Sequence, residues 1–308
     1  MQSKIAVIGA NGFVGRHLVE LLAGEGRPAL GVVRSDEGAR VVRERGGVAF
    51  QVPDLEASST RSLAPALEGC LGLVYTAAVS TATGPADRTE PSGLLNVLGA
   101  CRAAGVRRFV FLSGLGIAHY GMNPHCTNPY FLAKMAGEVA LFRSDLAVTV
   151  LRPSYIFGAG DEFLSPLIRR LAAEPTVEIP GRGDYRLQPI SVEDAARAIL
   201  DAMDRGPESG ARVIDLVGPE VLSYRALIER VVSILGRRVE IRERPVEEAQ
   251  AQARATGYFG LRPHDLACLL CDEVSDPGPV EVLVGRPLET VDGMVERTIA
   301  RLSGELGR

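Results

Sequence analysis

The sequence predicts an α/β fold: a doubly wound parallel sheet, followed by a smaller, mainly helical C-terminal region. Short apolar, β-branched runs alternate with segments of helical periodicity through the first half of the chain, and such alternation is typical of parallel strands joined by helices. The runs are continuously apolar, as expected for strands covered on both faces. A glycine-rich turn separates the first run from the first helical segment, so the chain can turn tightly there.

The individual elements follow from these patterns in order along the chain. Strands are predicted at residues 4–9, 29–34, 48–53, 71–78, 107–114, 147–154 and 212–218. Helices are predicted at residues 13–26, 59–67, 92–104 and 191–206, and around the segment YFLAK at 130–134. Ser191 and Asp194 are placed to cap the helix that they open.

The chain divides into two regions where this regular pattern loosens. After Pro153 the sequence becomes rich in glycine, proline and charge, and the last ninety residues are mostly helical, with a variable middle at 239–262. We expect one domain to comprise residues 1–157 plus 187–218. The second region then comprises residues 158–186 plus 219–308.

Length and composition exclude several classes of protein. The 308 residues suffice for one large or two modest domains, and 46% of them are hydrophobic, a share typical of soluble globular proteins. A net charge of −4 argues against general binding to nucleic acid or to a membrane surface. No apolar stretch is long enough to span a membrane, and the N-terminus lacks the pattern of a signal peptide.

The cysteines point to a reducing compartment. Their number is small and odd, which fits free thiols and a cytoplasmic location. They stand at positions 70, 101, 126, 268 and 271. Cys268 and Cys271 form the segment CLLC, but no second pair accompanies them, so we predict no metal site.

The segment GANGFVG at residues 9–15 carries the first chemical signal. It places three glycines directly after a predicted strand and at the start of a predicted helix. Gly9 allows a tight turn, Gly12 lets the backbone approach a pyrophosphate, and Gly15 lets the helix pack closely on the sheet. Free N–H groups at the helix N-terminus would hold the phosphate oxygens. The candidate dinucleotide contacts are Gly9, Asn11, Gly12, Phe13, Val14 and Gly15.

The segment YFLAK carries the second signal. Tyr130 and Lys134 stand four residues apart, so a helix brings both side chains to one face. A free phenol titrates near 10, too high for a good general base at neutral pH, and a neighbouring ammonium lowers that pKa. The spacing by itself fits proton exchange, but it also fits an ordinary amphipathic helix.

Taken together, these motifs resemble those of the short-chain dehydrogenase/reductase superfamily. The length and the segments LRPSYIFGAGD (151–161) and QPISVEDAARAI (188–199) look like its extended and atypical branches. Those branches include nucleotide-sugar epimerases and dehydratases, NmrA-like reductases and the NADPH-binding accessory subunit of respiratory complex I. The resemblance covers residues 4–220 and implies a Rossmann-type sheet with a C-terminal substrate region.

The resemblance also implies catalytic roles. Tyr130 would exchange a proton with the substrate oxygen, while Lys134 would hold the nicotinamide ribose and lower the tyrosine pKa. Ser113, at the end of the fifth strand, would orient the substrate oxygen. Many extended members carry two serines here and use the second, but this chain has Gly114 there, and Thr127 is an alternative source of the hydroxyl.

Further cofactor contacts follow from the same resemblance. Asp54 and Leu55 look like the pair that contacts adenine. The floor under the ribose and nicotinamide would come from Ala77 and Ala78. Backbone near the nicotinamide would come from Pro153 and Tyr155.

The end of the second strand bears on the choice of cofactor. An acidic residue there would bind the 2′-hydroxyl of NAD, whereas Arg34 suits the 2′-phosphate of NADP. Arg40 could assist, although Asp36 and Glu37 oppose it. We therefore favour NADP(H) over NAD(H).

Three functional hypotheses remain open at this stage. The first is an oxidoreductase that transfers hydride between NADP(H) and a carbonyl or alcohol of a small molecule. The second is a nucleotide-sugar epimerase or dehydratase, in which Arg186 would hold a substrate phosphate. The third is a non-catalytic NADPH-binding sensor or assembly subunit. The resemblance also implies that the long helices packed on the sheet pair in a homodimer.

Overall fold

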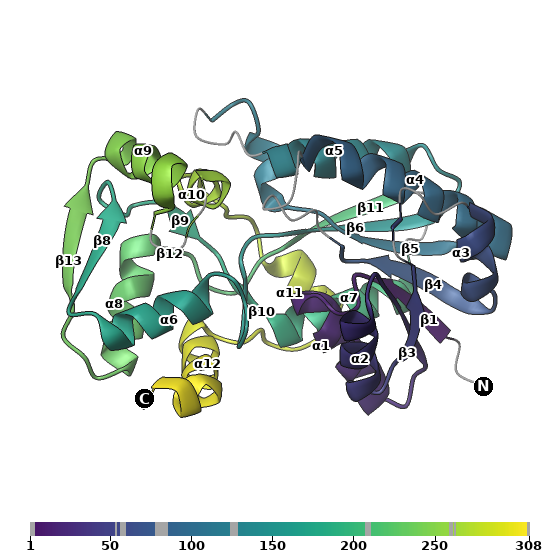
Figure 1. The fold of residues 1–308 in the computed structure, drawn as a ribbon, viewed down its shortest axis with the longest axis horizontal. Coiled ribbons are helices and arrows are strands. Elements are labelled where there is room, and N and C mark those ends of the chain that lie inside the picture. The colour runs from purple at the N-terminus through teal and green to yellow at the C-terminus, as the bar shows by residue number, and fades with distance from the viewer. Residues whose placement is uncertain are drawn as a thin grey trace.

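A seven-stranded sheet forms the centre of the larger lobe (Figure 1). The computed structural model describes residues 4–52, 54–55, 60–77, 86–123, 129–206, 211–258, 261 and 263–306, with the backbone alone at 86–91, 129, 264 and 305–306. The strand order is β11-β6-β5-β4-β1-β2-β3, and every neighbouring pair is parallel. The strands are β1 Lys4–Ile8, β2 Ala29–Val33, β3 Val48–Gln51, β4 Cys70–Tyr75, β5 Arg108–Leu112, β6 Ala147–Pro153 and β11 Ala211–Leu216.

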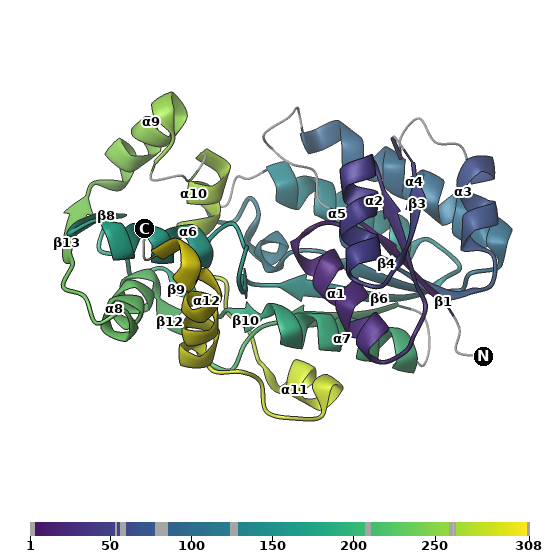
Figure 2. The ribbon, with the colours of Figure 1, turned by 60° about the horizontal axis from the view of Figure 1, so that its bottom comes forward.

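Helices cover both faces of this sheet (Figure 1, Figure 2). One layer consists of α1 Phe13–Gly24, α2 Asp36–Glu44 and α7 Val192–Arg205, and the other of α3 Thr60–Leu67, α4 Ala86–Ala104 and α5 Pro129–Phe142. Along β1, Ile5 and Val7 belong to one apolar core while Ala6 and Ile8 belong to the other, because successive strand residues point to opposite faces. The predicted doubly wound α/β fold is confirmed.

The elements differ from the prediction mainly at their ends. Helix α4 begins at Ala86, although the sequence indicated a start at 92. Residues 86–91 are polar, and Pro91 interrupts the apolar spacing, so periodicity alone could not find the first turns. The cap of α7 is as predicted, because the Ser191 hydroxyl accepts the backbone N–H of Asp194 at 3.0 Å.

A smaller lobe has an apolar core of its own. Its elements are α6 Leu164–Ala173, β8 Thr176–Pro180, β9 Arg186–Leu187, β12 Leu222–Ser223, α8 Tyr224–Ile234, β13 Glu240–Arg244, α9 Val246–Thr256, α10 Pro263–Leu269 and α12 Val291–Leu306. Strand β13 pairs in parallel with β8, and β12 pairs antiparallel with β9. The stretch 239–262, which looked variable in sequence, therefore holds a regular strand and helix.

The chain crosses between the two lobes several times. After β6 the chain pairs β7 Ile156–Phe157 with β10 Ile190–Ser191, so the entry to the smaller lobe and the return from it lie side by side. Helix α11 Gly278–Val284 packs on α7, and its Val280 and Leu283 belong to a core of the larger lobe. This placement differs from the expected division, which grouped residues 219–308 in the second region. The other expected boundaries stay a prediction.

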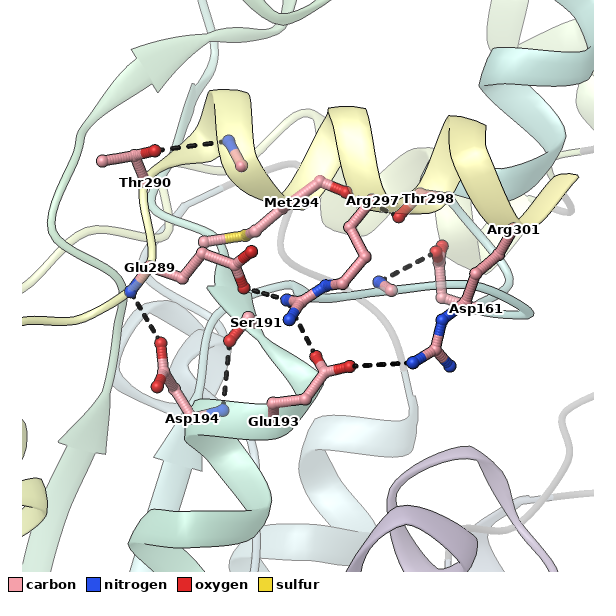
Figure 3. A network of polar contacts seen from close by, with 12 residues as sticks. Asp161, Ser191, Glu193, Asp194, Glu289, Thr290, Met294, Arg297, Thr298 and Arg301 are labelled. Carbon is pink, nitrogen blue, oxygen red and sulfur yellow. Dashed lines mark hydrogen bonds and ion pairs between the residues drawn. The ribbon is translucent and has the colours of Figure 1, made fainter. Parts of the chain in front are cut away.

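A network of ion pairs fixes α12 against the start of α7 (Figure 3). Arg297 pairs with Glu289 and, at 3.0 Å, with Glu193. Arg301 reaches the other oxygen of Glu193 at 3.9 Å. The Asp194 carboxylate accepts the backbone N–H of Glu289 at 2.7 Å. The last helix of the smaller lobe is thus anchored to a helix of the larger one.

Candidate functional site

The turn after β1 is shaped by glycines that other residues could not replace. Gly9 has φ +80°, and a Cβ there would lie 2.8 Å from the Ala77 nitrogen. A Cβ on Gly15 would lie 2.2 Å from the Gly9 oxygen. Both contacts are shorter than van der Waals distance, so these glycines allow α1 and β4 to approach the turn closely.

Gly12 faces outward. It is the N-cap of α1 with φ −69°, and no side chain caps the helix. A Cβ at Gly12 would meet only the Gly9 oxygen, at 3.2 Å. Asn11 is exposed, while Phe13 and Val14 are half-buried. The helix N-terminus therefore presents an uncapped, accessible backbone that suits a pyrophosphate.

The parallel strands bring further predicted residues to the same edge of the sheet. Strands β1, β4, β5 and β6 run in one direction, so the residues that follow them share one edge. The Ala77 carbonyl, after β4, accepts a hydrogen bond from Lys134 Nζ at 3.1 Å. Lys134 is only 1% exposed, and its ammonium lies 4.9 Å from the ring centroid of Phe111. A buried ammonium is thus held under the edge where a nicotinamide ribose would lie.

Tyr130 and Lys134 share a face of α5, as their spacing predicted. The Lys134 ammonium lies 5.4 Å from the centroid of the Tyr130 ring. The Tyr130 hydroxyl lies 3.4 Å from the Ser113 carbonyl oxygen, at the end of β5. The phenol is therefore beside both an ammonium and the sheet edge.

Ser113 points away from this edge. It is fully buried, and its hydroxyl donates to Glu138 at 2.7 Å. Glu138 in turn accepts two hydrogen bonds from Arg152, at 2.9 and 2.6 Å, and this bonding raises the pKa of Arg152. The expected contact between the Ser113 hydroxyl and a substrate does not fit this geometry, because the hydroxyl already serves a buried ion pair beneath the sheet edge.

The next residue occupies the place that faces Tyr130. A Cβ on Gly114 would lie 3.4 Å from Tyr130 Cε1 and 3.1 Å from Phe131 Cε1. Successive residues at a strand end point in opposite directions, so the position that could offer a hydroxyl here is a glycine. Thr127, the alternative source of a hydroxyl, lies outside the described residues.

The sequence pattern did not identify Glu138 and Arg152 as a buried pair. Each is a charged residue within a largely apolar run, in AKMAGEVALF and AVTVLRP. Isolated charged residues in buried elements usually have a partner, so the sequence did indicate that each of the two would be paired. Their pairing depends on the packing of α5 against β6, which local sequence does not reveal.

The residues predicted for the adenosine end lie around the β2 and β3 ends. Arg34 is exposed after β2, next to Ser35, which caps α2. Arg40 pairs with Glu37 and Glu44 along α2, which engages the side chain that was expected to assist Arg34.

The other predicted contacts lie close by, with one exception. Asp54 is exposed and Leu55 half-buried, and the Leu55 carbonyl accepts from Asn96 at 2.9 Å. Pro153 is half-buried at the end of β6, two residues before Tyr155. Ala78 lies outside the described residues.

Residues of the smaller lobe form an apolar wall against Tyr130. Cys268 and Cys271, at the end of α10, pack with Ile117, Phe131 and Tyr130. The four described cysteines are unbridged, and the structure describes no metal-binding group of His, Cys, Asp or Glu in the residues that it covers. Cys126 lies outside those residues.

The chain that follows α10 is fastened to β9. Residues 271–277 form what we call the junction segment. In it, Asp272 accepts from the Arg186 backbone at 2.8 Å and pairs with the Arg186 guanidinium at 2.7 Å. This pairing engages the side chain that was expected to hold a substrate phosphate.

No helix in the described part of the chain is both long and apolar enough to cross a membrane. Exposed apolar side chains lie on α4 and α5, namely Leu95, Leu132, Val139 and Phe142. The expected homodimer would form through long helices packed on the sheet. The homodimer stays a prediction.

Comparison with known proteins agrees with this geometry. Residues 9–206 match a family model described as NAD(P)H-binding. The chain is 25% identical over 255 residues to a 2-alkyl-3-oxoalkanoate reductase of Stenotrophomonas maltophilia, covering 76% of each chain. It is 29% identical to a ceramide reductase of Caulobacter vibrioides, covering 75% of this chain and 70% of that one.

A solved structure shares the fold of the whole chain. The UDP-glucose 4-epimerase of Thermotoga maritima superposes with a TM-score of 0.77 at 22% identity, over 98% of this chain and 99% of that one. The glycine loop and the match over residues 9–206 agree on a nicotinamide cofactor. The chain therefore belongs to the NAD(P)H-binding family, within the extended short-chain dehydrogenase/reductase superfamily.

Proposed function

We propose that the protein is an NADP(H)-dependent oxidoreductase that interconverts a carbonyl and an alcohol on a largely apolar small molecule. The observation that carries this proposal is the Tyr130–Lys134 pair, with the Lys134 ammonium beside the Tyr130 ring and bonded to the Ala77 carbonyl. The two curated relatives described above are named as reductases, which supports the direction of the reaction.

In this proposal, some residues at the sheet edge bind the cofactor and another transfers a proton. The backbone of the glycine loop binds the pyrophosphate at the start of α1. When bound, the cofactor supplies the hydride. Lys134 would hold the nicotinamide ribose, and Tyr130 would give its proton to the oxygen of the reduced carbonyl. The nearby ammonium then stabilises the phenolate that remains.

Ser113 acts in this scheme through its neighbours and does not contact the substrate. Its hydroxyl holds the Glu138–Arg152 pair under α5 and so positions the helix that carries Tyr130. Ser113→Ala should therefore leave turnover close to that of the wild type and lower the free energy of unfolding by about 1 kcal/mol. Steady-state kinetics and chemical denaturation measure the two effects.

Ser144→Ala provides the matched control, because the Ser144 hydroxyl bonds only locally near the far end of α5, donating to the Leu141 carbonyl and accepting the Leu146 N–H. A serine that contacted the substrate oxygen would behave differently. Its loss would lower turnover by about 10²–10³, as for other oxyanion donors, and that result would restore Ser113 as a catalytic residue.

Arg34 is proposed to select NADP(H) through the 2′-phosphate. Arg34→Glu should weaken NADPH binding by about tenfold to a hundredfold, the worth of one charged hydrogen bond, and should leave NADH binding largely intact. Fluorescence titration with each cofactor measures this. Arg40→Gln serves as the control, since Arg40 is bonded to Glu37 and Glu44. Equal cofactor affinities in the wild type would refute the proposed preference.

The proposal itself is tested by NADPH oxidation with a panel of uncharged ketones. A second candidate, a non-catalytic NADPH-binding subunit, is favoured by one observation, the glycine at position 114 facing Tyr130. Tight NADPH binding without turnover on a broad panel would support that candidate and overturn the enzyme. The epimerase alternative has less support, because Arg186 is committed to Asp272.

A further inference from the structure

A carboxyl group and a phenol are enclosed together at the junction of the two lobes. Glu273 is 6% exposed. Part of the Tyr155 ring reaches the surface, but its hydroxyl is enclosed and has no hydrogen-bond partner within the described residues. No hydrogen bond within those residues reaches the Glu273 carboxyl either. Buried polar groups are normally paired. The hydrogen bond from the Ser154 hydroxyl to the Glu273 carbonyl joins the two segments that carry these groups, so together they mark a place where a ligand can supply the partners.

The backbone around Glu273 is fixed by hydrogen bonds, in contrast to its carboxyl group. The Glu273 N–H donates to the Arg186 carbonyl at 2.9 Å, and its own carbonyl accepts from the Ser154 hydroxyl at 3.0 Å. Two residues on, the Ser275 N–H donates to the Gln188 side chain at 2.8 Å. The junction segment therefore fixes the Glu273 carboxyl in place without satisfying it.

Burial has the largest effect on the ionisation of both groups. The groups that act on the Tyr155 phenol are Glu273, Cys268, Cys271 and Tyr224. Burial raises the pKa of Glu273 to about 8. Burial, and then the Glu273 charge, raise the pKa of Tyr155 well above its ordinary value. At neutral pH both groups therefore keep their protons and act as hydrogen-bond donors.

The junction segment connects Glu273 to the proposed reaction site. Cys271 stands two residues before Glu273 and packs in the apolar cluster with Phe131 and Tyr130. Ligand sites commonly combine such an apolar wall with a few fixed polar groups. The Arg186 guanidinium is paired with Asp272, so it is engaged elsewhere.

We propose that Glu273 and Tyr155 form the recognition end of the substrate site and hydrogen-bond an uncharged carbonyl, hydroxyl or amide group of a largely apolar substrate. This inference rests on the proposed function and names its substrate class. An anionic group at the same place would be buried beside the Glu273 carboxyl, which is costly. The pair thus selects neutral substrates over carboxylates and phosphates.

The test compares two matched probes that differ in one charge. Methyl 3-oxodecanoate and 3-oxodecanoate are titrated calorimetrically into the full-length protein loaded with NADP⁺. The wild type should bind the ester at least about tenfold more tightly than the acid, the worth of one hydrogen bond or more. Tyr155→Phe and Glu273→Ala should each weaken ester binding by about tenfold, and Glu273→Ala should leave NADPH affinity unchanged.

The pH dependence separates recognition from a merely structural role. Ester binding by the wild type should weaken as pH rises through about 8, where Glu273 loses its proton. Glu273→Gln keeps a neutral donor of the same shape, so it should retain the affinity and lose this pH dependence. Glu229→Gln, at an exposed site on α8, is the matched control and should behave like the wild type.

Several outcomes would overturn the inference. They are no ester binding by the wild type, equal binding of ester and acid, and unchanged ester affinity in both Tyr155→Phe and Glu273→Ala. If the ester binds as expected but NADPH is not oxidised with it or with other ketones, the proposed function fails while the recognition site stands. Tyr130→Phe, which should still bind the ester, distinguishes the two.

Stability provides a readout that needs no ligand. Glu273 has an ordinary pKa of 4.5 when unfolded and about 8 when folded, so the folded state binds the extra proton between these values. Unfolding then releases a proton, and the melting temperature should fall as pH rises through this window. The Glu273→Gln variant should show a smaller fall, and an identical profile would contradict the enclosed, protonated carboxyl.

Discussion

Tyr130→Phe should lower turnover by about 10²–10⁴, the usual contribution of a positioned general acid or base. The variant removes only the hydroxyl that gives its proton to the substrate oxygen. The affinity for NADPH should not change, because the glycine loop and Lys134 are intact. Stability should change little as well, since the contact of the hydroxyl with the Ser113 carbonyl is long, at 3.4 Å.

Steady-state kinetics and fluorescence titration separate these quantities. Tyr120→Phe is the matched control, because Tyr120 packs against the same apolar cluster as Tyr130 and has no role in the proposed reaction. If Tyr130→Phe kept full turnover with a good substrate, another group would carry the proton. The proposed mechanism would then be wrong even if NADPH were the correct cofactor.

Alanine substitutions in the glycine loop should separate cofactor binding from folding. At Gly15 the new Cβ would lie 2.2 Å from the Gly9 oxygen, so Gly15→Ala should destabilise the protein by about 1–3 kcal/mol, as overpacking does. At Gly12 the only close atom is 3.2 Å away. Gly12→Ala should therefore fold nearly normally, and should bind NADPH about tenfold to a hundredfold more weakly by obstructing a charged backbone contact.

Gly24→Ala, in the same helix, is the matched control. Nothing lies within 4 Å of a Cβ at that position, so alanine should stabilise α1 by about 0.5–1 kcal/mol without affecting NADPH. Thermal unfolding and fluorescence titration on the three variants give the comparison. Normal NADPH affinity in Gly12→Ala would mean that the pyrophosphate does not lie on this loop.

The features that the sequence predicted are those that local pattern determines. The strand and helix order follows from apolar runs and glycine turns, and the structure confirms the parallel sheet. Tyr130 and Lys134 could be brought together because helical spacing alone puts them on one face. The glycine loop was predictable for the same reason, since its three positions act within seven residues.

The features that escaped prediction depend on distant partners. Which way Ser113 points is decided by Glu138 and Arg152, and these lie on other elements. Glu273 stands in the segment CDEVSD, which reads as an ordinary polar loop. Its enclosure arises only because the junction segment is pinned against residues about 85 to 120 positions earlier, as the bonds to Gln188 and Ser154 show.

The repeated passage of the chain between the lobes has a consequence for how the protein unfolds. The smaller lobe is assembled from separate stretches, and the chain leaves it to place α11 on α7 before returning with α12. The anchors of that return, Arg297 and Glu193, belong to different lobes. Neither lobe can therefore melt without removing packing from the other, so we expect the two lobes to unfold in a single cooperative transition.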